Sequence, residues 1–174
     1  AGTGSGGLTS ILAYYVGKEG KVFTYERNES HQGKAKKNIR NLGMSERVVF
    51  HLGDAENGFE EKDVDAVFLD MPNPYDVMHH VKSSLKYGGF FGSILPTTNQ
   101  VSKLLLELRA NGFQYIQVVE TFFRYYKPQP DRLRPVDRMV AHTGFLVFAR
   151  NMVTADFESE EMKRDQGIYT PKGK

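Results

Sequence analysis

Apolar residues follow two spacings along the chain, one typical of strands and one typical of helices. Short runs rich in β-branched and aromatic residues are predicted as strands, and they cover 21–25, 48–52, 64–69, 90–95, 115–121 and 143–149. Elsewhere apolar residues recur every three or four positions, which predicts helices over 8–16, 29–42, 77–87 and 101–111. This alternation predicts an α/β fold, a mostly parallel, doubly wound sheet with helices on both faces.

Local signals refine the predicted elements. Asn28 is a predicted N-cap for the helix over 29–42, and Gly43 is its predicted stop. The strand over 64–69 is almost continuously apolar, which predicts burial on both faces. No helix separates the last two strands, so we predict that they form an antiparallel hairpin at the sheet edge, joined by a loop rich in Pro and Arg.

The length of 174 residues predicts one domain with a core of its own. With 40% hydrophobic and 25% charged residues, the chain has the composition of an ordinary globular domain. Composition turns polar after Arg150, so we predict a folded domain over 1–150 and a tail over 151–174 that is mobile or ordered by a partner.

Composition also excludes several kinds of chemistry. The absence of Cys rules out disulfides, a thiolate nucleophile and a Cys-ligated zinc ion, and it fits a reducing cytoplasm, where we predict the protein to be. No signal peptide opens the chain and no apolar run approaches about 18 residues, so we predict no membrane partner. The five His show no metal-ligand spacing, and we predict no metal. A net charge of +2 does not by itself indicate a nucleic-acid binder.

A glycine loop opens the chain and leads into the first predicted helix. The pattern Gly2-x-Gly4-x-x-Gly7 lets the backbone turn sharply and approach a ligand, and the helix start then offers free N–H groups. It indicates a nucleotide-type cofactor, with a tight turn that binds nothing as the alternative. Such a loop normally follows a strand, so we expect a central strand of the sheet to precede Ala1.

Two acidic residues stand at the ends of successive predicted strands. Glu26 follows the strand over 21–25, where an acid binds ribose hydroxyls in related folds. Asp54 follows the next strand, where a carboxylate can accept a hydrogen bond from an adenine amine. Dinucleotide enzymes usually need the first acid alone, so the pair favours S-adenosylmethionine. The alternative is that both are solvated loop acids.

A third acid, Asp70, directly follows the strand over 64–69. Two prolines, Pro72 and Pro74, restrict the backbone of the turn after it, and such rigidity suits a positioned catalytic group. A carboxylate here would point into the crevice where sheets of this class bind ligands. The alternative is an Asp that caps the next helix.

Further along the chain, polar residues could bind a nucleic acid. Gln100, at a predicted helix start, could bind an adenine edge or could serve only that helix start. The loop between the last two strands contains both aromatic and basic residues, and the basic ones include Arg124, Arg134 and Arg138. This combination is suited to binding RNA. An ordinary loop or a subunit interface explains it equally well. We interpret the basic stretch over 34–40 as a solvated helix face and His142 as a loop-stabilising residue.

Four segments together resemble the tRNA (adenine-58-N1)-methyltransferase family of class I, Rossmann-like S-adenosylmethionine-dependent methyltransferases. These are 1–9, 25–27, 69–74 and 134–146, and their order also agrees with that family. The resemblance implies that Asp70 holds the target adenine and also borders the cofactor. It implies cofactor contacts at Gly2, Gly4, Ser5, Gly6, Glu26, Arg27, Asp54 and Ala55. It further implies an amino-terminal β-rich domain and a homotetramer.

The chemistry of adenine fits Asp70 without the family. The methyl of S-adenosylmethionine is already activated, and adenine N1 carries a lone pair, so the enzyme mainly has to align the two. A carboxylate bound to the 6-amino group would stabilise the positive charge that develops. Together with the resemblance, which alone implies tRNA and position 58, this chemistry predicts a methyltransferase acting on N1 of adenine 58 in tRNA. The alternatives are a small-molecule O- or N-methyltransferase, a non-catalytic RNA-binding subunit and, more weakly, a nicotinamide-binding domain.

Overall fold

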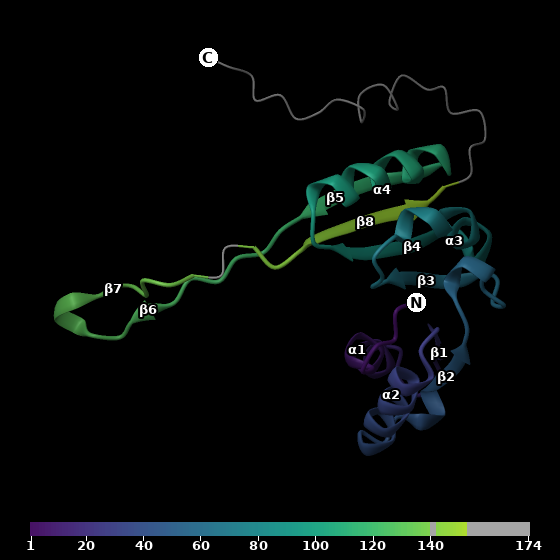
Figure 1. Cartoon of the computed structure of the whole chain (residues 1–174), viewed down its shortest axis with the longest axis horizontal. Coiled ribbons are helices and arrows are strands. Elements are labelled where there is room, and N and C mark those ends of the chain that lie inside the picture. Colours follow the sequence, from purple (N-terminus) through teal and green to yellow (C-terminus); the bar gives the residue numbers. More distant parts are fainter. Residues whose placement is uncertain (140–141, 153–174) are drawn as a thin grey trace, which may run out of the picture.

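The computed structural model describes residues 1–139 and 142–152, so the predicted tail lies outside the described residues from 153 onward. Two sheets form its body (Figure 1). In the smaller sheet, β1 (Val22–Glu26) pairs in parallel with β2 (Val48–Leu52). The larger sheet has the order β3-β4-β8-β5, with bounds Val64–Leu69, Leu85–Leu95, Phe145–Asn151 and Phe113–Val119.

Strand directions confirm the predicted fold class. The β3 and β4 strands are parallel, whereas β8 runs antiparallel to both β4 and β5. The predicted hairpin of the last two strands is therefore present, with β5 at the edge and β8 inside the sheet. Asn151, the last residue of β8, is buried, and its side-chain amide donates to the carbonyl of Leu85 at 2.8 Å.

Each sheet packs against its own pair of helices. The helices α1 (Gly7–Tyr15) and α2 (Glu29–Asn41) cover the smaller sheet, and α3 (Met78–Ser84) and α4 (Thr98–Ala110) pack on the larger one. The small core consists of Ala13, Val22, Ile39 and Val48. The larger core includes Leu69, Met78, Val81, Phe91, Leu104, Leu108 and Val147. Burial of these apolar side chains is the main force that holds the elements together.

Helix boundaries follow local chemistry. As predicted, Asn28 caps α2, since its side-chain oxygen accepts from the backbone N–H of Ser30 at 2.9 Å and of His31 at 3.2 Å. The chain leaves α2 at Gly43, which has a φ of 68°. Short 3₁₀ turns at Ser45–Arg47, Ala55–Asn57 and Pro74–Val77 link the larger elements.

The helix predicted over 77–87 is shorter in the structure. It ends at Ser84, because Leu85 takes an extended conformation and pairs with Val64 as the first residue of β4. Leu85 is also buried in the larger core. Sheet pairing and burial therefore override the helical spacing of this segment.

The predicted burial of β3 on both faces is wrong for part of the strand. Leu69 is buried, but Asp65 and Ala66 are exposed. The reason is that β3 pairs with β4 along one edge, while its other edge faces a groove of about 480 Å³ that separates it from β1.

The start of the chain bridges the two sheets at one end of the groove. The Ala1 nitrogen donates to the Phe68 carbonyl at 2.8 Å, and the Ala1 carbonyl accepts from the Asp70 N–H at 3.0 Å. On the other side, the Gly2 N–H donates to the Tyr25 carbonyl at 3.1 Å. The glycine loop is thus fixed between the ends of β1 and β3.

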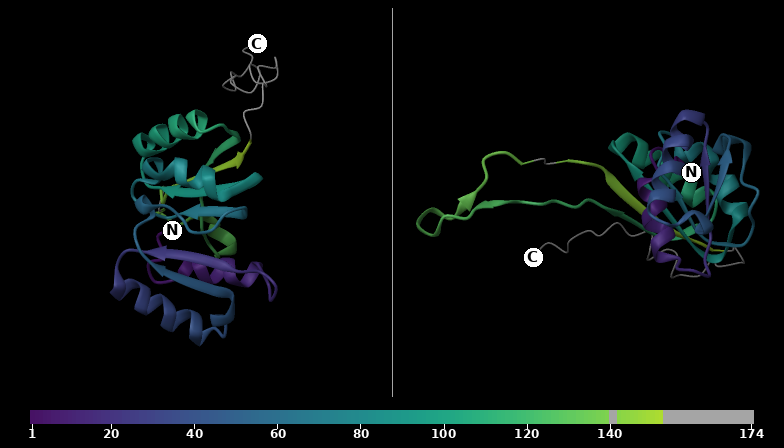
Figure 2. Two further views of the ribbon diagram at one scale, coloured as in Figure 1. Left: turned by 90° about the vertical axis from the view of Figure 1, so that its right-hand side faces the viewer. Right: turned by 90° about the horizontal axis from the view of Figure 1, so that it is seen from below.

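A long arm leaves the body between β5 and β8 (Figures 1 and 2). We define the arm as residues 120–139 and 142–144. Near its tip, β6 (Tyr126–Lys127) pairs antiparallel with β7 (Arg134–Pro135), and a 3₁₀ turn at Pro130–Arg132 reverses the chain. The loop predicted here is therefore an extended projection. Among the described residues, no helix combines the length and apolar content that crossing a membrane requires.

Candidate active site

The carboxyl ends of β1, β2 and β3 meet the glycine loop around a cavity of about 450 Å³. A cavity of this size suits a small molecule. Seven of the residues predicted to bind cofactor line it: Gly2, Gly4, Glu26, Arg27, Asp54, Ala55 and Asp70. The structure therefore brings together residues that the sequence places at the ends of three different strands.

Gly2 lies where the glycine loop passes directly over the turn that carries Asp70. Its φ of +85° is in the left-handed region, and a Cβ at this position would lie 1.9 Å from the Asp70 carbonyl oxygen. No side chain fits there, so only glycine allows the backbone to pass this close. The same contact joins the cofactor loop to the Asp70 turn.

Glu26 fastens the glycine loop to the end of β1. Its side chain is buried, with 8% relative exposure, and one oxygen accepts from the Gly4 N–H at 2.9 Å. The other oxygen accepts from the Asn28 N–H, also at 2.9 Å. A carboxylate offers about four lone-pair sites, so two remain for hydroxyl donors on the cavity side.

Asp54 and Arg27 form the neighbouring wall. One Asp54 oxygen accepts from the Glu56 N–H at 3.1 Å and starts the 3₁₀ turn, and the other lies 3.6 Å from the Arg27 guanidinium. The Arg27 side chain is 73% exposed, so this ion pair adds little stability. Ala55 is buried beside them. This wall can accept a hydrogen bond from a donor such as an exocyclic amine.

Asp70 stands exposed at the mouth of the cavity. Its backbone N–H is held by the Ala1 carbonyl, and Tyr75 braces the turn by donating to the Asn73 side chain at 2.8 Å. Among the described residues, no hydrogen bond or ion pair engages the Asp70 carboxylate. Its oxygens are therefore free to accept from a ligand.

Ser5 and Gly6 do not line the cavity. The Ser5 carbonyl accepts from the Asn38 side chain at 3.0 Å. Gly6 has a φ of +87°, and a Cβ there would lie 3.2 Å from the Cα of Ala35. Both residues thus serve the contact between α1 and α2, which the spacing of glycines alone does not reveal.

The Gln100 side chain contacts the turn that carries Asp70, but it binds a backbone carbonyl of that turn. The Gln100 side-chain amide donates to the Pro72 carbonyl at 2.9 Å, and its oxygen accepts from the Thr97 hydroxyl at 2.6 Å. Thr97 also accepts from the Gln100 N–H at 3.4 Å as the cap of α4. Both ends of the amide therefore have protein partners, and Gln100 acts as a strut between α4 and the turn.

The three predicted RNA-binding arginines lie on the arm. Arg124, Arg134 and Arg138 are exposed and belong to the arm, which projects away from the body (Figure 2). The structure does not bring them together with the carboxylates. They belong to a second surface.

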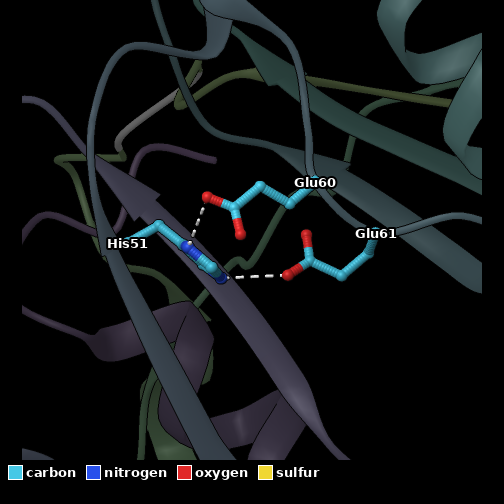
Figure 3. Close-up of side chains that lie close together, drawn as sticks. All are labelled: His51, Glu60 and Glu61. Carbon is cyan, nitrogen blue, oxygen red and sulfur yellow. Dashed lines mark ion pairs between the residues drawn. The ribbon is translucent and has the colours of Figure 1, made fainter.

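One cluster was missed by the sequence analysis. His51 on β2 lies between two carboxylates, with its Nδ1 3.5 Å from Glu60 and its Nε2 2.9 Å from Glu61 (Figure 3). These are residue types that can ligate a metal. The two carboxylates lie beside different nitrogens of the ring, and we assign no metal ion to this cluster. Glu60 and Glu61 lie in the loop before β3, where the sequence has no periodic pattern from which their contact with His51 could be predicted.

Tyr25 completes this cluster. Its ring stacks on His51 with centroids 4.5 Å apart, and its hydroxyl donates to Glu61 at 2.7 Å. Burial, and then the hydrogen bond to Glu61, raise the pKa of Tyr25 to about 12. Tyr25 is therefore neutral at physiological pH and serves to hold the loop before β3 against β1.

Solved structures resemble this fold closely. A protein described as an S-adenosylmethionine-dependent O-methyltransferase from Thermotoga maritima has a TM-score of 0.86 and 46% identity, and the match covers 90% of this chain and 59% of that one. The tRNA (m1A58) methyltransferase TrmI from Aquifex aeolicus has a TM-score of 0.77 and 37% identity, covering 87% and 60%. The fold is that of the Rossmann-type, class I S-adenosylmethionine-dependent methyltransferases.

Sequence comparison then defines the family. The sequence profile described as the tRNA methyltransferase complex GCD14 subunit matches residues 1–137, and the chain belongs to this family. The tRNA (adenine(57)-N(1)/adenine(58)-N(1))-methyltransferase TrmI from Methanocaldococcus jannaschii is 34% identical, with 86% of this chain and 62% of the relative covered. The chain spans about three fifths of the length of the curated relatives that it matches first.

Proposed function

We propose that the protein transfers a methyl group from S-adenosylmethionine to N1 of adenine 58 in tRNA. The observation that carries this proposal is the exposed Asp70 carboxylate, which has no partner among the described residues and lines the same cavity as Glu26 and Asp54. Membership of the family and the names of its relatives support it. The alternative of a non-catalytic RNA-binding subunit fits less well, because this chain keeps both the glycine loop and Asp70.

The cavity fits the cofactor on geometric grounds. Gly2 lets the glycine loop lie directly against the Asp70 turn where both line the cavity, and Glu26 keeps free lone pairs for ribose hydroxyls. Asp54 can accept from the adenine amine of the cofactor. The cofactor supplies an activated methyl group. The task left to the protein is to hold the lone pair of adenine N1 in line with that methyl group.

Asp70 acts on the target base. Its carboxylate accepts a hydrogen bond from the 6-amino group of adenine, which turns N1 toward the cofactor side of the cavity. As N1 is methylated, positive charge spreads to the amino group, and the nearby carboxylate stabilises it. Since the base lies within a folded tRNA loop, it has to leave its stack to enter the cavity.

The direct test uses the full-length protein, methyl-labelled S-adenosylmethionine and unmodified tRNA. We expect label in 1-methyladenosine after digestion to nucleosides. A tRNA with guanine in place of adenine 58 is the matched control and should take up no label. Label in a small hydroxyl compound, and none in tRNA, would favour O-methyl transfer, the activity named for the Thermotoga maritima protein.

We further propose that the arm joins copies of this chain, as in the homotetramer that the family resemblance implies. Aromatic side chains on it are exposed without a partner in the body, notably Phe123 at 78% and Tyr125 at 76%. Contiguous apolar exposure of this kind marks an interaction surface. The double variant Phe123→Ser and Tyr125→Ser should lower the molar mass measured by light scattering.

The family description also names a complex, so a heteromer is the competing outcome. Light scattering of the unmodified protein alone separates the two: a tetramer supports self-assembly, whereas a monomer contradicts it.

We also propose that the tRNA-modifying activity is cytoplasmic.

A further inference from the structure

His142 joins the base of the arm to the end of β4. Its Nδ1 contacts the carboxylate of Glu120, which follows β5, and its Nε2 lies 2.7 Å from the carbonyl oxygen of Pro96. The ring also packs on Phe145, with centroids 4.7 Å apart. One side chain thus connects three segments that are distant in sequence.

The two partners of the ring are both hydrogen-bond acceptors. A neutral imidazole has a single N–H and can donate to one of them, whereas an imidazolium has two and can donate to both. The full set of contacts therefore requires the protonated ring. Among the described residues, the charged group in contact with the ring is Glu120.

A line of hydrogen bonds continues from Pro96 to the active-site turn. Thr97, the next residue, donates to the Gln100 side chain at 2.6 Å. The Gln100 amide in turn donates to the Pro72 carbonyl at 2.9 Å, two residues after Asp70. The base of the arm is therefore linked to the Asp70 turn through neighbouring residues.

We propose that His142 is a positioning residue: its protonated ring clamps the arm to Pro96 and, through Thr97 and Gln100, holds Asp70 in place for a substrate bound by the arm. This inference rests on the proposed methyltransferase function. It assigns His142 no contact with the cofactor or with the reacting atoms. Its effect is on large substrates, since they alone reach both the arm and the cavity.

The electrostatic environment of His142 also favours the protonated ring. The hydrogen bond to Glu120, and then the one to Pro96, raise the pKa of His142 above its ordinary value of 6.5. A raised pKa means that the clamp is complete below 6.5 and is lost as the pH rises through the folded-state pKa. The clamp therefore weakens on the alkaline side of neutrality.

The test measures kcat/KM for tRNA from pH 6 to 9 at saturating S-adenosylmethionine. The unmodified protein should lose activity as the pH rises through the pKa of His142. His142→Ala should lower kcat/KM by about tenfold at pH 6 and abolish this decline. His142→Gln, which keeps a neutral amide donor, should recover part of the activity and show no decline. Glu120→Gln should shift the decline to lower pH.

Two controls separate the clamp from a general loss of structure. His79→Ala, at an exposed position on α3, should keep the pH profile of the unmodified protein. The Kd for S-adenosylmethionine should stay within about twofold in all variants, because the clamp does not touch the cofactor wall. An unchanged profile in His142→Ala would overturn the proposal while leaving methyl transfer to tRNA intact.

Amide hydrogen exchange tests the clamp without any activity. His142→Ala should raise the exchange of Gln100 and Val101, whose N–H groups donate to Thr97, and His79→Ala should not. If the unmodified protein does not methylate tRNA but exchange rises as expected, the proposed function fails and the clamp stands. If exchange at Gln100 and Val101 is unchanged, the clamp is wrong whatever the protein methylates.

Discussion

The cavity and the arm are built in opposite ways. Contacts of the glycine-loop backbone fix the cavity: the Gly4 N–H donates a hydrogen bond to the Glu26 carboxylate, and Gly2 lies against the Asp70 turn. The arm has one short ladder near its tip and exposes Phe123 and Leu133 by 78% and 68%. A small cofactor needs a wall that exists before it arrives, whereas a macromolecule supplies much of the surface against which an arm packs.

This contrast predicts that variants in the two regions affect different measurements. The largest effect should come from Asp70→Ala, which removes the carboxylate that we propose stabilises charge on the target base. We expect methyl transfer to tRNA to fall by about a hundredfold or more, with the Kd for S-adenosylmethionine changed by less than about threefold. Calorimetry and single-turnover kinetics give the two numbers. Full activity in this variant would refute the role of Asp70.

Glu26→Gln should act on the cofactor first. The amide keeps one acceptor oxygen but faces the second backbone N–H with a donor, so the Kd for S-adenosylmethionine should rise about ten- to a hundredfold. Glu29→Gln, on the exposed start of α2, is the matched control and should leave the Kd unchanged. Equal affinity in both variants would contradict the ribose-binding role of Glu26.

Removing charge from the arm should have a smaller and more selective effect. In the triple variant Arg124→Gln, Arg134→Gln and Arg138→Gln, we expect KM for tRNA to rise several-fold at moderate salt and the salt dependence of binding to weaken by about one unit of slope per arginine. Cofactor affinity should not change. Lys34→Gln with Lys37→Gln, on the exposed face of α2, tests whether any loss of positive charge has the same result.

The smallest effect should be that of Leu133→Ala on stability. Leu133 has few neighbours to lose, so the free energy of unfolding in urea should change by less than about 0.5 kcal/mol. Leu104→Ala, on the buried face of α4, provides the contrast and should cost about 2–5 kcal/mol. A comparable loss in both variants would show that the arm is packed within its own chain.

The sequence predicted the cavity well because carboxyl ends of parallel strands meet at one edge of a sheet. Glu26, Asp54 and Asp70 each follow a strand directly, so their proximity required only the strand assignments. Asn28 and Gly43 marked the ends of α2 for an equally local reason. Helix caps, helix stops and strand ends depend on a few neighbouring residues, so they can be predicted without knowing how the chain packs.

Features that depend on distant partners were not predictable in this way. Leu85 joins β4 because Val64 pairs with it, which a helical spacing does not show. His51 meets Glu60 and Glu61 through a loop without a pattern. The extended shape of the arm depends on the direction in which the ends of β5 and β8 leave the sheet. A run of basic and aromatic residues does not determine that direction.

The close approach of Gly2 to the Asp70 carbonyl has a consequence for the binding of the two ligands. A ligand that stiffens the glycine loop also stiffens the Asp70 turn, so binding at one lowers the entropic cost of binding at the other. We therefore expect the cofactor and the nucleobase to bind with positive coupling. Saturating S-adenosylmethionine should lower the Kd for tRNA, and saturating tRNA should lower the Kd for S-adenosylmethionine by the same factor.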